Sequence, residues 1–488
     1  MKRLIPLVVL CAALCGCGKV IPADDEVAVV PLPERVVKGQ GTFLLTASTE
    51  AVLLSGDDSL ACGTGALDEV LEPVFGKGLR VRHADVPLDG ALNISCDAAM
   101  PADGYRLEIT PGRAEIVGGS AAGAFYAVQT LRQLIPVAAY DATGVRAVEL
   151  PVVTIEDKPC LGYRGMMLDV GRHFFTVDEV KQVIDLLSLY KFNVLHMHLT
   201  DNEGWRIEIK SHPKLTEIGG MRENEGKPVG FFTQEQYKEI VAYAQERFIT
   251  IVPEIDLPGH TKAIFAAYPD LKNAAKLNFQ LNMSGQAIGA LDVDDPKATQ
   301  LVKDVIAELA AMTPGSYIHI GGDETWGLSE DKYVRFVDQT RRIVKEQGKK
   351  VVGWQESART NLDEGDLMQY WVHYKNTPSA DNASDTTKKK KSTMPKELQE
   401  MMKEAFMKNA KDMGLGLEKK ARIILSPSGY VYLDHPYKEA SVDSTQAAEQ
   451  GRLGLAGYTK QTIAEMYDWN PAKFDDRLDP AKDIAGVE

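Results

Sequence analysis

Eight short apolar segments recur along the last two thirds of the chain, and longer segments with helical spacing separate them. The apolar segments are YRGMMLDV (163–170), FNVLHMHL (192–199), FITIVPEIDL (248–257), YIHIGG (317–322), KKVVGW (349–354), DLMQYW (366–371), ARIILSP (421–427) and DIAGV (483–487). Strand-like runs that alternate with helices are typical of parallel sheets, because the crossover helices cover the sheet faces. Eight such repeats over residues 156–488 predict an α/β fold, a TIM-type (β/α)8 barrel. A doubly wound open sheet is the alternative.

A different pattern precedes the barrel, over residues 41–155. The segments GYRLEIT and GRAEIVGG (104–119) alternate in hydrophobicity like the two strands of a hairpin, with a Pro-Gly turn between them. Residues 120–136 have helical spacing, with Ser120 as a plausible cap and Pro136 as a stop. This region therefore predicts a small N-terminal α/β domain.

An insertion at about 376–415 interrupts the barrel between its sixth and seventh strands. Its first half is polar and contains a lysine run at 388–391, which is typical of a solvated segment. Its second half has apolar residues near helical spacing, and we expect a helix packed on the barrel rim. These residues are Leu398, Met402, Phe406 and Ala410.

The N-terminus indicates export. Residues 1–17 have a basic start, a short apolar stretch and small residues before a cysteine, as in a signal peptide. The ending LCGC resembles the bacterial lipobox, which implies cleavage before Cys17 and acylation of that residue; an ordinary signal peptide is the alternative. Residues 18–40 are rich in proline and charge and predict a tether with an entry strand. We expect an exported protein, lipid-anchored at a bacterial cell envelope membrane, on its periplasmic or surface face.

Charge and cysteine content exclude several classes of function. The formal net charge of −14 argues against a nucleic-acid partner, because such proteins need a basic face. Cys62, Cys96 and Cys160 lie outside the signal segment, so at most one intramolecular disulfide is available. No CxxC pair remains there to indicate a zinc ribbon.

Charged and aromatic residues follow the predicted strands. In a barrel of this kind the active site lies beyond the carboxyl ends of the strands. In chain order these residues are Asp169, Arg172 and His173; Asp201; Glu254, Asp256 and His260; Asp323 and Glu324; Trp354 and Glu356; Tyr370 and Trp371; and Tyr432 and Asp434. We expect them to converge on one rim of the barrel.

The mixture of carboxylates and indoles on that rim suits a sugar ligand. Glycoside hydrolysis needs a carboxylic acid to protonate the leaving oxygen and a charged group near the anomeric carbon. Asp323 and Glu324 are adjacent, and each disfavours ionisation of the other, so one can stay protonated near neutral pH. An adjacent Asp-Glu pair is also common on protein surfaces. This pair directly follows a strand and two glycines, which favours a site.

A metal site is the alternative reading of the histidines. His196 and His198 lie two apart on a predicted strand and therefore face the same side. An HxH motif on a barrel strand suggests a metal-dependent hydrolase, with His260 and Asp323 as further ligands. Barrel interiors also bury hydrogen-bonded histidines without a metal, and we expect neither a metal nor another cofactor.

An ordered set of motifs resembles family-20 glycoside hydrolases, the β-N-acetylhexosaminidases. The motifs are MLDVGRHFF, HMHLTDNEGWR, VPEIDLPGH, HIGGDE, VVGW, QYW and YLD. The resemblance covers about residues 40–488 and includes the family's small N-terminal domain. It implies a (β/α)8 barrel, N-acetylhexosamine-containing glycans as substrates and no cofactor.

The resemblance also implies a substrate-assisted mechanism with an oxazolinium intermediate. Glu324 matches the general acid/base, Asp323 matches the residue that orients the substrate's 2-acetamido group, and Tyr432 matches the hydroxyl that binds the acetamido oxygen. The remaining matches are Trp354 and Trp371 as walls of the acetamido pocket, Arg172 and Asp434 as contacts to sugar hydroxyls, and Asp201 with His260 as a pair that tunes the acid.

The sequence departs from the family at its end. It stops at DIAGVE, where the family continues into a Trp-x-Glu segment. We therefore expect the chain to lack the last helix of the barrel and one pocket wall, with the eighth unit incomplete. Two alternatives to an active hexosaminidase remain at this point: a glycan-binding lipoprotein that has lost catalysis, and the metal-dependent hydrolase.

Overall fold

The computed structural model describes most of the chain. The described residues are 18–54, 58–221, 226–275, 289–325, 327–372, 396–455 and 458–488. The signal segment with Cys17, residue Trp326 and the first half of the insertion lie outside them. The chain forms two compact units, Met1–Cys160 with Leu189–Lys191, and Leu161–Ser188 with Phe192–Glu488. The predicted fold class, a small α/β domain followed by a (β/α)8 barrel, is confirmed.

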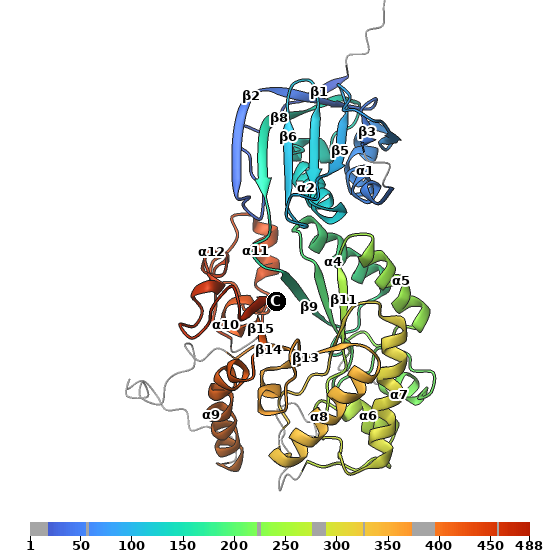
Figure 1. Ribbon diagram of the computed structural model, residues 1–488, viewed down its shortest axis with the longest axis vertical. Helices are drawn as coiled ribbons and strands as arrows, with labels where there is room; N and C mark the ends of the chain where they lie inside the picture. Colours follow the sequence, from blue (N-terminus) through green and yellow to red (C-terminus); the bar gives the residue numbers. More distant parts are fainter. Residues whose placement is uncertain are drawn as a thin grey trace, which may run out of the picture. The chain divides into compact units, whose positions relative to one another are not determined.

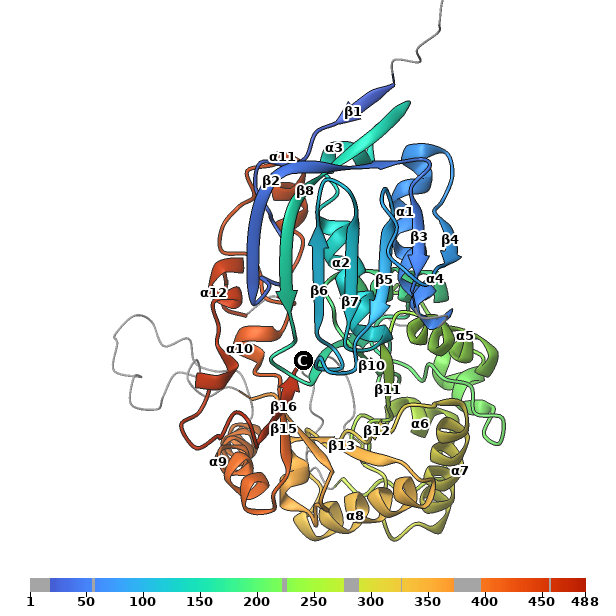
Figure 2. The same cartoon turned by 45° about the horizontal axis from the view of Figure 1, so that its top comes forward.

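The smaller unit is an eight-stranded sheet with helices against it. The strands are β1 (Lys19–Ile21), β2 (Arg35–Thr46), β3 (Glu50–Leu53), β4 (Arg80–His83), β5 (Leu92–Cys96), β6 (Tyr105–Ile109), β7 (Ala114–Gly118) and β8 (Val145–Asp157). Their order is β1-β8-β6-β7-β5-β3-β4, and β2 pairs with β8. The helices are the 3-10 turn η1 (Asp58–Ala61), α1 (Cys62–Phe75), α2 (Ala121–Gln133) and α3 (Val137–Tyr140). Figure 2 shows this sheet with α1 and α2 along it.

Local patterns in this unit fold largely as predicted. The expected hairpin is the antiparallel pair β6 and β7, and the Ser120 side chain accepts the N–H groups of Ala122 and Gly123 at the start of α2. Residues 18–40, predicted to be a tether with an entry strand, contain more strand than expected. Lys19–Ile21 pairs with β8, and β2 begins at Arg35, so the segment 18–40 already contributes two strands. A three-residue strand carries too little periodicity to be found in a sequence.

The larger unit is a closed parallel barrel. Its strands are β9 (Tyr163–Asp169), β10 (Val194–His198), β11 (Thr250–Glu254), β12 (Tyr317–His319), β13 (Lys350–Trp354), β14 (Leu367–Tyr370), β15 (Arg422–Leu425) and β16 (Ile484–Val487). All eight fall within the predicted apolar segments. β16 pairs in parallel with β9, which closes the ring and makes the open-sheet alternative wrong. The eighth strand, expected in an incomplete unit, is present.

Helices cover the outer side of the barrel, where Figure 1 shows α5, α7 and α8 outside the strands. The helical elements of this unit are α4 (Val177–Leu189), the π-helix η2 (Leu215–Gly220), α5 (Gln234–Gln245), α6 (Lys262–Ala267), α7 (Pro296–Met312), α8 (Glu330–Glu346), η3 (Gln355–Arg359), α9 (Lys396–Glu418), α10 (Ser428–Val431), α11 (Ser444–Gln450), α12 (Ile463–Tyr467) and η6 (Pro471–Lys473). In α7 the residues Leu301, Val305 and Leu309 repeat every four positions and are all buried, so this stripe faces the strands.

The second half of the insertion is helical, as predicted. α9 spans Lys396–Glu418, and Met413 packs in a buried cluster with Met368 of β14 and Ile423 of β15. Ala410, expected on the packed face, is exposed. The side chains of the other three residues of the predicted stripe lie outside the description. Among the described helices, none combines the length and apolar character needed to cross a membrane.

Candidate active site

The turn after β12 presents the two adjacent carboxyl groups. Gly321 and Gly322 have φ angles of +67° and +102°, and Glu324 has +44°. A Cβ on Gly321 would lie 1.8 Å from Oδ1 of Asp256, and the same oxygen accepts the backbone N–H of Gly322 at 3.1 Å. Only glycine fits a position with this φ and this close approach. The glycine pair thus lets the chain turn sharply at the strand end.

Asp323 and Glu324 share one imidazole neighbour. Nε2 of His260 lies 3.7 Å from a carboxyl oxygen of each. The Asp323 side chain is 17% exposed and that of Glu324 41%. Desolvation in the pocket, followed by the charge of Asp323, raises the pKa of Glu324 above the ordinary glutamate value. This arrangement favours a protonated Glu324, which is what a general acid requires.

A buried ion network supports His260. Its Nδ1 lies 3.1 Å from Oδ1 of Asp201, and Nη2 of Arg172 lies 2.8 Å from Oδ2 of the same carboxylate. Burial alone would lower the pKa of His260, but the charges of Asp201, Asp256 and Asp323 outweigh it and raise the pKa. Burial would raise the pKa of Asp201, yet His260 and Arg172 hold it well below the usual value. The sequence predicted Arg172, Asp201 and His260 for the site, and in the structure both Arg172 and His260 contact Asp201.

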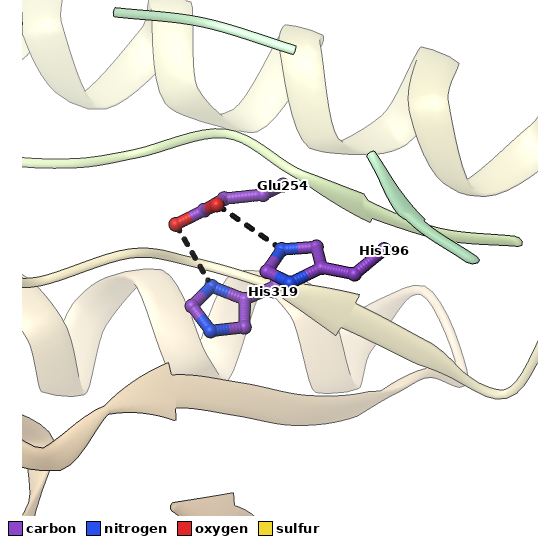
Figure 3. Close-up of side chains that lie close together, drawn as sticks. All are labelled: His196, Glu254 and His319. Carbon is purple, nitrogen blue, oxygen red and sulfur yellow. Dashed lines mark ion pairs between the residues drawn. The ribbon is translucent and has the colours of Figure 1, made fainter. Parts of the chain in front are cut away.

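Glu254 at the end of β11 lies at the centre of the buried polar groups. It is fully buried, and Figure 3 shows its two carboxyl oxygens facing His196 and His319, at 3.1 Å from a nitrogen of each. A further contact of the same carboxyl group is Nδ1 of His198 at 2.5 Å. Nε2 of His198 in turn lies 2.9 Å from Asp201. A continuous chain of contacts therefore connects Glu254, through His198 and Asp201, to the histidine beside the acid.

The buried histidines differ in charge. Burial lowers the pKa of His196, but the carboxylates of Glu488 and Glu254 outweigh it and raise the pKa to about 9. Nδ1 of His196 lies 2.7 Å from Glu488. Burial lowers the pKa of His319 below its ordinary value, and its Nδ1 accepts the N–H of Gly321 at 3.0 Å. His196 is therefore charged and forms a buried ion pair with Glu488, whereas the lowered pKa of His319 favours its neutral form.

Several clusters of these residues could hold a cation. The predicted ligands His196, His198, His260 and Asp323 do not form one of them. In the described part of the chain, ligand atoms within 4.8 Å of one another occur in the clusters His196–Glu254–His319 and His260–Asp323–Glu324, among others. The predicted ligand set is wrong, because its members divide between separate clusters.

The two predicted tryptophans are held by carboxyl groups. The indole N–H of Trp354, at the end of β13, donates to Oε1 of Glu254 at 2.8 Å. The indole N–H of Trp371, just after β14, donates to Oε2 of Glu356 at 3.3 Å. Trp354 is buried and Trp371 half-buried. Both indoles therefore have fixed orientations at the barrel rim.

Tyr432 and Asp434 lie in the long connection between β15 and β16. Tyr432 is half-buried, and burial followed by the charges around it, that of Asp323 foremost, raises the pKa of its phenol well above the ordinary value. The phenol is therefore a hydrogen-bond donor over the physiological range. Asp434 is exposed, and its carbonyl accepts the N–H of Leu455 at 2.7 Å.

The predicted site residues thus gather at the carboxyl end of the barrel, apart from Cys17, which lies outside the described residues. Sequence reasoning noted Glu254 and Glu356 as rim residues but gave them no role. Their strand-end positions were the available signal. It considered His198 only as a metal ligand, and it gave no role to His319, because no local pattern distinguishes a buried hydrogen-bonding side chain from an ordinary core residue.

Comparison with known proteins identifies the family. Residues 161–488 match the glycosyl hydrolase family 20 catalytic domain, and residues 26–158 match domain 2 of the same family. The chain belongs to glycosyl hydrolase family 20. It is therefore a glycoside hydrolase, as the ordered motifs predicted.

Similar proteins span both units. The chain is 35% identical over 466 residues to a β-N-acetylhexosaminidase of Cellulomonas fimi, covering 95% of this chain and 84% of that protein. A β-hexosaminidase of Porphyromonas gingivalis is 34% identical over 377 residues, covering 71% of this chain and 48% of that protein. The structure of the family-20 β-N-acetylhexosaminidase from Streptomyces coelicolor A3(2) has a TM-score of 0.75 at 34% identity, covering 94% of this chain and 85% of that one. The N-acetyl-β-hexosaminidase of Streptomyces plicatus has a TM-score of 0.76 at 35% identity, covering 94% and 84%.

Proposed function

We propose that this glycoside hydrolase is an exo-acting, retaining β-N-acetylhexosaminidase. Its substrates are glycans that end in β-linked N-acetylglucosamine or N-acetylgalactosamine. The observation that supports this most strongly is the placing of Asp323 and Glu324 on one turn, each 3.7 Å from His260, with the pKa of Glu324 raised. The names of the Cellulomonas and Streptomyces relatives support the same substrate class.

Two carboxyl groups with different tasks explain the adjacent acidic pair. Protonated Glu324 donates its proton to the glycosidic oxygen as the bond from that oxygen to the anomeric carbon breaks. The carbonyl oxygen of the substrate's own acetamido group attacks the anomeric carbon and forms an oxazolinium ion. Asp323 accepts the acetamido N–H and stabilises the positive charge that develops there. Water, deprotonated by Glu324, then adds to the anomeric carbon and restores the acetamide with overall retention.

The surrounding residues position the sugar in this mechanism. Tyr432 donates to the acetamido oxygen, and Trp354 with Trp371 encloses the acetamido methyl group. Arg172 and Asp434 bind the outer hydroxyls. His260, held by Asp201, lies near both carboxyl groups, and its positive charge limits how far the pKa of Glu324 rises.

The direct test is hydrolysis of a chromogenic β-N-acetylglucosaminide by wild type and Glu324→Gln. The variant keeps the shape of the acid but has no proton to donate, and we expect a loss of roughly 10²–10⁴-fold. Azide added to Glu324→Gln should not restore turnover by replacing a nucleophilic side chain of the enzyme. In the proposed mechanism the nucleophile belongs to the substrate, so the enzyme has no such side chain. Activity that survives the substitution contradicts the assignment. Sugar binding without turnover by the wild type would instead favour the glycan-binding alternative.

We also propose that the protein is exported and anchored by a lipid on Cys17, at the periplasmic or surface face of a bacterial envelope membrane. The lipobox-like LCGC sequence supports this. Labelled fatty acid should be incorporated into the wild-type chain and not into Cys17→Ala. An unlabelled wild-type chain released into the soluble fraction contradicts the anchor.

A further inference from the structure

The turn after β13 and the helix α9 share a buried polar cluster that the proposed mechanism leaves unused. Glu356 in η3 is buried, and Oε2 of its carboxyl group accepts the indole N–H of Trp371 at 3.3 Å. Its other oxygen lies 3.4 Å from Nδ2 of Asn409 in α9. One carboxyl group therefore connects a tryptophan at the rim to the helix that forms the second half of the insertion.

Further bonds hold the same three segments together. Oε1 of Gln355 accepts the backbone N–H groups of Trp371 and Val372 at 3.2 and 3.0 Å. Its Nε2 donates to the carbonyl oxygen of Asn409 at 3.3 Å. Arg359, at the end of η3, donates to Oδ1 of Asn409 at 2.6 Å. The backbone around Trp371 is thus fixed to η3, and η3 is fixed to α9.

Arg359 extends this connection along α9. It reaches both carboxyl oxygens of Asp412 at 2.9 and 2.7 Å, in the bidentate geometry that gives guanidinium–carboxylate pairs their directional strength. Asp412 is fully buried, so the pair is shielded from solvent. The second half of the insertion therefore contributes two buried side chains, Asn409 and Asp412, to the cluster that holds Trp371, a predicted wall of the sugar pocket.

We propose that Glu356 is a positioning residue for the acetamido pocket. Its carboxyl group holds the indole of Trp371 in place, and α9 supports Glu356 through Asn409. This inference rests on the proposed function, since Trp371 matters only if it encloses the substrate's acetamido group. In a substrate-assisted reaction that group is the nucleophile. Its wall therefore determines both acetamido binding and the geometry of attack.

The charges around Glu356 agree with this role. The facing titratable groups are Asp323 from the catalytic turn, Tyr333 from α8, Asp412 from α9 and Arg359 from η3. Burial, followed by the charges of Asp323 and Asp412, raises the pKa of Glu356 to about 8. The side chain is then a neutral acid at pH 6, and glutamine is its close mimic.

The test compares inhibition by N-acetylglucosamine with inhibition by glucosamine, which lacks the acetyl group, at pH 6. In Glu356→Ala we expect inhibition by N-acetylglucosamine to weaken about tenfold or more and kcat to fall on the order of 10²-fold, with little change for glucosamine. Glu356→Gln should restore the wild-type preference, because its amide oxygen accepts the same indole N–H. Asn409→Ala should show a smaller shift in the same direction.

Ser357→Ala is the matched control. Ser357 neighbours Glu356 on η3 and is buried, but its hydroxyl has no hydrogen-bond partner within the described structure, so the variant should keep the wild-type preference. Equal weakening for both sugars, or the same change in Ser357→Ala, overturns the proposal. This failure is distinct from failure of the proposed function, in which wild type itself does not hydrolyse the β-N-acetylglucosaminide.

Discussion

The indole N–H of Trp354 donates to Oε1 of Glu254 at 2.8 Å, although the two residues lie 100 positions apart in the chain. The other carboxyl oxygen of Glu254 contacts His198, which contacts Asp201. Trp354, a wall of the proposed acetamido pocket, and the ion network behind Glu324 are therefore anchored to the same buried carboxylate. A change at Glu254 should affect both halves of the proposed mechanism.

Glu254→Gln tests this coupling. The glutamine amide removes the negative charge between the imidazoles of His196 and His198. Its NH2 group also replaces one carboxylate oxygen, so a hydrogen-bond donor faces another N–H group. Breaking a buried ion pair costs about 3–5 kcal/mol, and we expect a loss of that order in the free energy of unfolding, measured by denaturant titration. We also expect kcat/KM to fall on the order of 10²-fold.

Glu239→Gln is the control. It removes a half-exposed carboxylate paired with Lys181 and should change stability by less than about 1 kcal/mol. Equal effects of the two substitutions would contradict the coupling.

Asp323→Asn should move the pH profile of the remaining activity. The charge of Asp323 helps to raise the pKa of Glu324, and Glu324 acts in its protonated form. Without that charge the pKa of Glu324 falls, so the alkaline limb of kcat/KM, which reports the free enzyme, should shift to lower pH. A shift to higher pH, or none, would mean that the carboxyl groups do not interact as the structure indicates.

Stability should depend on pH through Glu356. Its folded pKa of about 8 lies above the ordinary value of 4.5, so at pH 6 the folded state holds a proton that the unfolded state has lost. Unfolding then releases a proton, and stability falls as pH rises from about 4.5 to about 8. Glu356→Gln has no such group. The free energy of unfolding of the variant, minus that of wild type, should therefore increase across this range, by at most about 5 kcal/mol. A difference that is constant with pH contradicts the shifted pKa.

Gly321→Ala should abolish the catalytic turn. The added methyl group would meet Oδ1 of Asp256 at 1.8 Å at a φ of +67°, and we expect a loss of about 2–4 kcal/mol in stability together with at least 10²-fold in kcat/KM. Gly348→Ala is matched in φ, at +71°, but its Cβ meets nothing within 4 Å. It should cost about 1 kcal/mol and leave the kinetics unchanged. If Gly348→Ala proves as damaging as Gly321→Ala, then φ strain rather than the contact with Asp256 explains the requirement.

The strand ends made the site predictable from the sequence. Parallel strands in a barrel end on one rim, so residues placed just after different apolar segments are expected to meet there. Asp323, Glu324, His260 and Trp354 were brought together on this ground alone. The two glycines before Asp323 added a local reason for a sharp turn. These signals are either local or a consequence of the topology, and both can be read from one sequence.

The contacts between distant segments were not predictable in this way. Asn409 meets Glu356 across 53 positions, and Glu488 meets His196 across 292. Such pairs depend on how each loop or strand packs, and no periodicity marks them. The metal-ligand set failed for the same reason. His196 and His198 do lie on one strand, but they fall into two different clusters, each of which also contains Glu254.

The central claim is that the substrate's own acetamido oxygen attacks the anomeric carbon, and a series of N-acyl substrates tests it most directly. Hydrolysis of 4-nitrophenyl β-glucosaminides carrying acetyl, difluoroacetyl and trifluoroacetyl groups should slow progressively, because fluorine withdraws electrons from the attacking oxygen. We expect kcat/KM to fall by more than about 10²-fold across the series. Rates that stay level from acetyl to trifluoroacetyl would show that an enzyme carboxylate or water attacks instead, and would contradict the proposed mechanism.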